Sequence, residues 1–128
     1  MEADYPGDYE AAVAFLDRRI GYGIRPGLER INHLLGLMGN PHRSYPVIHV
    51  AGTNGKTTVV RMISDILGAH GLFTGSFTSP HLHRVEDRYA VGGTTFGKTH
   101  LARAVEDLAP FVVMEEEQFD ESPTYFEL

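Results

Sequence analysis

The chain has 128 residues, 42% of them apolar, which suits one domain with a packed core, so we expect a single folding unit. It contains no cysteine, which excludes disulfides, thiolate metal sites and thiol nucleophiles. The formal net charge of -6, with scattered basic residues, disfavours nucleic-acid binding, and the lack of a long apolar run or a signal-peptide pattern predicts a cytoplasmic protein without a membrane partner.

Two helices are predicted in the first forty residues. Apolar residues recur at helical spacing over residues 9–20, with Asp8 placed to cap this helix and Gly21 placed to stop it. Pro26 is expected to open a second helix, which Gly39-Asn40-Pro41 ends.

A strand, a glycine-rich turn, a helix and a second strand are predicted next. Residues 47–51 form a short apolar run typical of a buried parallel strand, within which we interpret His49 as a hydrogen-bonded core histidine. The helix after the turn ends at His70-Gly71, and residues 72–77 form the next strand. Such a crossover implies a parallel sheet, so we predict an α/β fold with a parallel sheet flanked by helices.

The segment 78–97 is polar and rich in turn formers, and we interpret it as a functional loop. Within it, residues 88–91 and 94–96 flank two glycines as a hairpin. A last full helix is expected over residues 101–112, bent or interrupted at Pro110.

The end of the chain carries two further patterns. Glu115-Glu116-Glu117 is most simply a solvated acidic helix end. Ser122-Pro123 is typical of the start of another helix, within which the chain stops at Leu128, and this abrupt end is expected of a fragment.

The turn between residues 51 and 59 predicts a phosphate site. Its Gly-x-x-Gly-Lys-Thr pattern brings free backbone N–H groups, a helix dipole and one ammonium to a single anion. Lys56 can reach the terminal phosphates of a nucleotide, and Thr57 or Thr58 can meet Mg²⁺. Val50 stands where the strict phosphate-loop pattern has glycine, and the alternative is a turn without a ligand. The candidate nucleotide-binding residues are Gly52, Thr53, Asn54, Gly55, Lys56, Thr57 and Thr58.

A zinc site is a weaker interpretation of the histidines. His81 and His83 lie close together in sequence, but in an extended loop two such side chains project to opposite sides. We therefore expect no zinc there.

Several segments of the chain resemble the Mur ligase superfamily, and within it the folylpolyglutamate synthase and dihydrofolate synthase branch. They are Gly39-Asn40-Pro41, Tyr45 to Val50, the phosphate loop (Ala51 to Thr57), Thr78-Ser79-Pro80-His81-Leu82, and Pro123-Thr124-Tyr125-Phe126-Glu127. Two positions depart from the branch. Asp87 precedes Arg88 where the branch has glutamate, and Thr57 follows the lysine where the branch usually has glycine. Glu127 matches the branch motif, although a glutamate in a first helical turn also compensates the helix dipole.

The resemblance implies an ATP-dependent ligase that joins glutamate to folate or dihydropteroate through an acyl phosphate. It implies ATP and Mg²⁺ as cofactors, Lys56 as the catalytic phosphate ligand, and Ser79 with Thr57 as metal ligands. Pro80, His81 and Arg88 would belong to a substrate loop. By the same resemblance, residues 1–128 are the N-terminal part of the ATP-binding domain, without the C-terminal domain. We expect this fragment alone to be inactive and the full-length enzyme to be a monomer.

Two other functions stay open. A cell-wall Mur ligase acting on a UDP-linked peptide is favoured by Thr57-Thr58 and disfavoured by the Ser-Pro-His-Leu loop. A non-catalytic nucleotide-binding module is the second alternative. An ordinary kinase or GTPase is disfavoured, because no apolar strand ending in aspartate follows to supply the second magnesium site.

Overall fold

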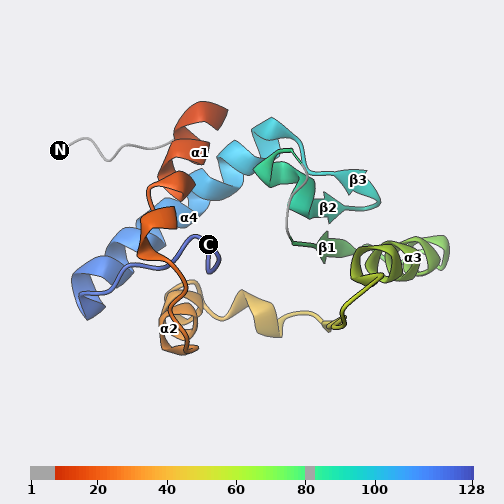
Figure 1. Ribbon diagram of the computed structural model, residues 1–128, viewed down its shortest axis with the longest axis horizontal. Coiled ribbons are helices and arrows are strands. Elements are labelled where there is room, and N and C mark those ends of the chain that lie inside the picture. The colour runs from red at the N-terminus through yellow and green to blue at the C-terminus, as the bar shows by residue number, and fades with distance from the viewer. Residues whose placement is uncertain (1–7, 80–82) are drawn as a thin grey trace. The chain divides into compact units, whose positions relative to one another are not determined.

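The computed structural model describes residues 8–79 and 83–128 (Figure 1). They group into two compact units, where the composition led us to expect one. The helical unit comprises Met1–Pro46 and Thr99–Leu128, and the strand unit comprises Val47–Lys98. In the part of the chain that the structure describes, no helix is long and apolar enough to cross a membrane.

The first helix of the helical unit, α1 (Tyr9–Asp17), begins as the sequence predicts. The backbone N–H of Ala11 donates to the Asp8 carboxylate at 2.7 Å, which satisfies one of the free donors at the helix start. The predicted stop near Gly21 falls within a 3₁₀ turn, Ile20–Tyr22, that follows the helix.

The second helix, α2 (Glu29–Leu37), starts later than predicted. Pro26 does not open it, because Gly27 has φ of 120°, a left-handed conformation that cannot belong to a right-handed helix. The predicted stop is confirmed, with φ of 83° at Gly39 and 57° at Asn40.

The long helix α4 (Lys98–Phe119) continues through Pro110, so the predicted interruption does not occur. Proline removes one helical hydrogen bond, but apolar side chains on both sides of it remain buried and hold the helix in place. The buried apolar residues of the helical unit are Ala12, Phe15, Leu16, Leu34, Leu101, Ala102, Val105, Ala109 and Val112.

The prediction of a solvated acidic end at Glu115-Glu116-Glu117 is wrong for its first two residues. Glu115 is 0% exposed, and Glu116 accepts a hydrogen bond from the Arg19 guanidinium at 2.9 Å. Glu115 follows the buried Val112 by three positions and therefore lies on the same face of α4. Helical periodicity was the signal that could have identified it.

The last residues of the chain form a turn instead of the predicted helix. Thr124 N–H donates to Oε2 of Glu127 at 2.8 Å, and Glu127 N–H donates to Thr124 O at 3.1 Å. Glu127 also pairs with Arg30 of α2 at 3.1 Å. The bond from the Thr124 N–H to the Glu127 carboxylate is one half of a capping box, but the Glu127 N–H bonds to the Thr124 backbone carbonyl and not to its side chain, so the described residues form one turn and the predicted helix is wrong for them.

In the strand unit, α3 (Lys56–Ala69) has the predicted position and ends at His70 and Gly71, whose φ is 81°. Three short strands follow, β1 (Gly75–Phe77), β2 (Tyr89–Val91) and β3 (Thr94–Thr95). The predicted hairpin is confirmed, because Gly92 and Gly93 have φ of 59° and 79° between β2 and β3.

The predicted parallel pairing is wrong for the described residues. Residues 47–51 are not a strand, and β1 pairs antiparallel with β2, Phe77 opposite Tyr89. Val47 and Ile48 are 70% and 61% exposed, and His49 is exposed instead of buried. An apolar run becomes a buried strand only where neighbouring strands and helices cover it, and the described chain supplies no such partner. The mixed helix and strand content nevertheless agrees with the predicted α/β class.

Candidate nucleotide site

The loop that precedes α3 uses two glycines in conformations that other residues adopt with strain. Gly52 has φ of 153° and Gly55, at the N-cap of α3, has φ of 76°. A Cβ built on either glycine would meet no heavy atom within 4 Å. The glycines are therefore required by backbone conformation, and the space beside the loop is open.

The start of α3 has features that favour an anion. Among the described residues no side chain caps this helix, so the N–H groups of its first turn stay available. The Lys56 ammonium donates to Gly52 O at 2.5 Å and thus lies across the loop. Residues 52–58 are all exposed. Free N–H groups, the positive end of the helix dipole and one ammonium together favour a phosphate.

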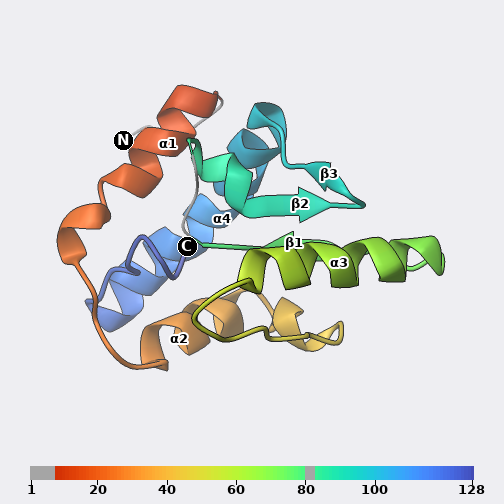
Figure 2. The same ribbon diagram turned by 45° about the vertical axis from the view of Figure 1, so that its right-hand side comes forward.

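The segment after β1 leads toward this loop. β1 runs back along α3 in the opposite direction, so the chain leaves β1 toward the end of α3 that carries the loop (Figure 2). Ser79 is exposed two residues after β1, and the preceding Thr78 N–H donates to Arg88 O at 2.8 Å. Ser79 and Arg88, two of the predicted site residues, therefore lie on neighbouring stretches of backbone. Pro80 and His81 lie outside the described residues.

Asp87, which sequence reasoning treated only as a departure from a motif, has a structural role. Its carboxylate accepts the backbone N–H groups of Arg84 at 2.9 Å and His83 at 3.2 Å. The bond from Arg84, with the one from His83, lowers the pKa of Asp87. These bonds hold the 3₁₀ turn Val85–Arg88, whose last residue, Arg88, directly precedes β2. The signal in sequence was an aspartate placed three residues into a turn.

Comparisons with known proteins agree with the motifs. No family model matches the chain. It is 40% identical over 95 residues to the dihydrofolate synthase/folylpolyglutamate synthase of Mycobacterium tuberculosis, covering 74% of this chain and 20% of that protein. It is 32% identical over 120 residues to the enzyme of the same name from Bacillus subtilis, covering 94% of this chain and 28% of that protein.

Solved structures give the same result for the fold. The folylpolyglutamate synthase of Mycobacterium tuberculosis complexed with ADP matches with a TM-score of 0.82 at 36% identity, over 94% of this chain and 28% of that chain. A folylpolyglutamate synthase complex with AMPPCP and folate matches with a TM-score of 0.82 at 30% identity, over 94% and 30% of the two chains. The chain is a relative of the folylpolyglutamate and dihydrofolate synthases. The resemblance to these synthases and the predicted α/β class are therefore confirmed, and the chain spans less than a third of the length of these relatives.

Proposed function

We propose that this chain is the nucleotide-binding portion of an ATP-dependent ligase that adds glutamate to folate or dihydropteroate. The observation that carries the proposal is the open, glycine-containing loop at the uncapped start of α3, with Lys56 lying across it. Support comes from the relatives, since matching structures hold ADP, AMPPCP or AMPPCP with folate.

The proposed reaction has two steps. A carboxylate oxygen of the folate compound attacks the terminal phosphorus of ATP, ADP leaves, and an acyl phosphate forms. The amino group of glutamate then attacks the carbonyl carbon, and phosphate leaves as the amide bond forms. Both steps place negative charge on phosphoryl oxygens, and the residues that would stabilise it are Lys56 and the N–H groups of residues 52–58.

Mg²⁺ fits the donors that this unit offers. Thr57 and Ser79 are exposed hydroxyl groups, which are hard oxygen ligands. The described residues contain no cluster of His, Asp and Glu that could hold a metal ion by itself, and Mg²⁺ at nucleotide sites commonly takes only one or two protein ligands. When bound, the ion would neutralise phosphate charge. Pro80, His81 and Arg88 would form the loop that faces the acceptor substrate.

A second candidate rests on one observation. Thr57 and Thr58 follow Lys56 as in cell-wall Mur ligases, whose acceptor is a UDP-linked peptide. Comparing folate and UDP-peptide acceptors in a protein that spans the length of the relatives separates the two candidates. Folate-dependent ATP turnover supports the proposal, and turnover only with the UDP-peptide overturns it.

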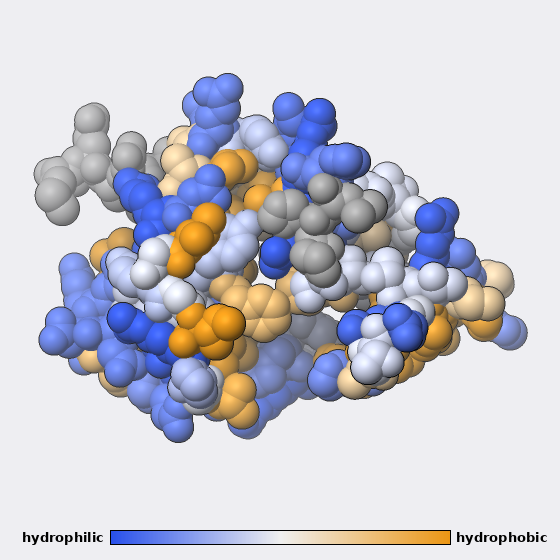
Figure 3. All heavy atoms as spheres, in the orientation of Figure 1, coloured by the Kyte–Doolittle hydropathy of each residue, from blue (hydrophilic) through white to orange (hydrophobic). Residues whose placement is uncertain are grey.

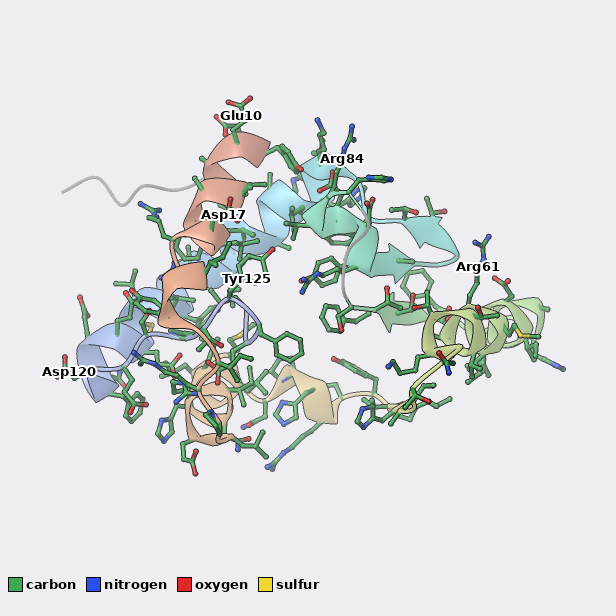
Figure 4. All side chains as sticks on the ribbon, in the orientation of Figure 1. Glu10, Asp17, Arg61, Arg84, Asp120 and Tyr125 are labelled. Atoms are coloured by element: carbon green, nitrogen blue, oxygen red, sulfur yellow. The ribbon has the colours of Figure 1, made fainter. Side chains whose placement is uncertain are left out.

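Nucleotide binding is tested with the 128-residue chain and AMPPCP with Mg²⁺ by calorimetry. Lys56→Ala removes a charged donor, so we expect the Kd to rise about ten- to a hundredfold. The matched control is Arg61→Ala, because Arg61 is an exposed cation that projects from α3 five residues further on (Figure 4). If both substitutions raised the Kd equally, the effect would come from the loss of one positive charge anywhere on α3, and this result would contradict a phosphate site at Lys56.

A further inference from the structure

The least expected group in the helical unit is the carboxylate of Glu115. It is 0% exposed, and neither of its oxygens has a hydrogen-bond partner among the described residues. An ionised carboxylate without a partner is strongly disfavoured in such a place, whereas a protonated one is tolerated. Nothing in the proposed nucleotide site uses this residue.

Four charged groups act electrostatically on Glu115, and three of them are acidic. They are Glu116 on α4, Glu121 and Glu127 on the C-terminal segment, and Arg30 on α2. Arg30 is already engaged, because its guanidinium pairs with Glu127 at 3.1 Å and donates to Arg25 O at 2.6 Å. Glu116 is paired with Arg19 at 2.9 Å. A negative charge on Glu115 would therefore meet acidic neighbours and a cation held by another carboxylate.

The pKa values of Glu115 and Glu127, two carboxyl groups on which Arg30 acts, shift in opposite directions. Burial, followed by the charges of Glu127 and Glu121, raises the pKa of Glu115 to about 7. Burial also opposes ionisation of Glu127, but hydrogen bonds from Arg30 and Thr124 outweigh it and lower the pKa of Glu127. Glu115 thus keeps its proton over a pH range in which Glu127 is ionised.

We propose that Glu115 is a proton-dependent switch for the C-terminal turn, residues 124–127. With its proton on, Glu115 is neutral, and Glu127 stays bound to Arg30 and to Thr124. With its proton off, Glu115 repels Glu127 and competes with it for Arg30, so the turn loosens from α2. This inference is independent of the proposed ligase activity.

The raised pKa of Glu115 determines how the stability of the fold changes with pH. The pKa of Glu115 is about 7 in the folded chain and 4.5 for an ordinary glutamate, so the group stabilises the fold fully below pH 4.5. As the pH rises from 4.5 to 7, the unfolded chain loses this proton and the folded chain retains it, and the stabilisation is lost. At tenfold per unit, the pKa difference between about 7 and 4.5 corresponds to a total loss of about three hundredfold in the folding equilibrium constant once the pH has passed the folded pKa.

The test is a ¹³C NMR titration of the glutamate carboxyl groups in the 128-residue chain, read together with the Thr124 amide. We expect Glu115 to titrate near pH 7 and the Thr124 amide to shift with the same midpoint. Glu115→Gln, which keeps the shape without the charge, should remove that transition from Thr124. Glu117→Gln, at an exposed neighbour on α4, should leave it unchanged.

Two results would overturn the proposal. One is a Glu115 carboxyl that titrates below pH 5 with ordinary exposed glutamates. The other is a Thr124 amide that does not follow Glu115 in the wild-type chain, or that keeps its transition in Glu115→Gln. If Glu115→Gln does not fold, the two midpoints in the wild-type chain decide the question without it.

Discussion

The helical unit and the strand unit differ most in what their helices bury. In the helical unit α1, α2 and α4 each bury part of one face, and His33 of α2 stacks on Phe119 of α4 with ring centroids 4.0 Å apart. In the strand unit none of the residues of α3, all of which the structure describes, is buried. Figure 3 shows apolar atoms at the surface around α3, and Met62 and Ile66 are each 58% exposed.

Stability and the proposed binding loop therefore lie in different units of the chain. Packed apolar side chains stabilise the helical unit, whereas the strand unit relies on short antiparallel strands and aromatic contacts. Phe77 and Tyr89 have ring centroids 5.3 Å apart, and Tyr89 and Phe96 have centroids 5.8 Å apart. We expect the strand unit to be the less stable part, and it is also the part that carries the phosphate loop.

The largest expected effect comes from truncating one leucine in each unit. Leu34 of α2 is 2% exposed and Leu72, just after α3, is 57% exposed. Leu34→Ala should destabilise the helical unit by about 2–5 kcal/mol, because it leaves a cavity in packed surroundings. Leu72→Ala should change stability by less than about 1 kcal/mol. Urea unfolding followed by circular dichroism measures both, and equal losses would mean that the two units are packed alike.

Amide hydrogen exchange sharpens the same comparison without substitution. Amides in the middle of α4 should exchange more slowly than those in the middle of α3, because α4 has a buried face and α3 has none among the described residues. Exchange at equal rates in the two helices would contradict the difference in stability.

The smallest effect concerns the helix caps. Asp8→Ala removes the acceptor of the Ala11 N–H bond and should destabilise α1 by about 1 kcal/mol. Asp17→Ala, at the other end of the same helix, is the control, because an aspartate at a helix C-terminus opposes the dipole. It should be neutral or slightly stabilising, and a loss as large as that of Asp8→Ala would show that the cap contributes nothing specific.

The features that the sequence predicted well depend on local chemistry. Asp8 caps α1, Gly71 follows the end of α3, and Gly92-Gly93 form the hairpin turn, all because the signals lie within a few residues of the structure they specify. The conformation of the phosphate loop is likewise specified by residues within the loop, Gly52 and Gly55. Its proposed ligands remain predictions.

The features that the sequence predicted badly depend on distant partners. Residues 47–51 have the composition of a buried strand, but a strand needs a neighbour to bond with, and the described chain does not provide one. The acidic run predicts a solvated Glu115, although its spacing from Val112 puts it on the buried face of α4. The Arg30–Glu127 pair joins residues that are far apart in sequence, and no local pattern indicates it.

Binding of nucleotide phosphates at the start of α3 is tested by an NMR titration of the 128-residue chain with ADP and Mg²⁺. The two helix starts provide an internal comparison, because Asp8 caps α1 whereas no described side chain caps α3. We expect the amides of residues 52–58 to shift on adding ADP and the amide of Ala11, bonded to Asp8, to stay unshifted. Unshifted amides in residues 52–58 at millimolar ADP, or equal shifts at both helix starts, would contradict it.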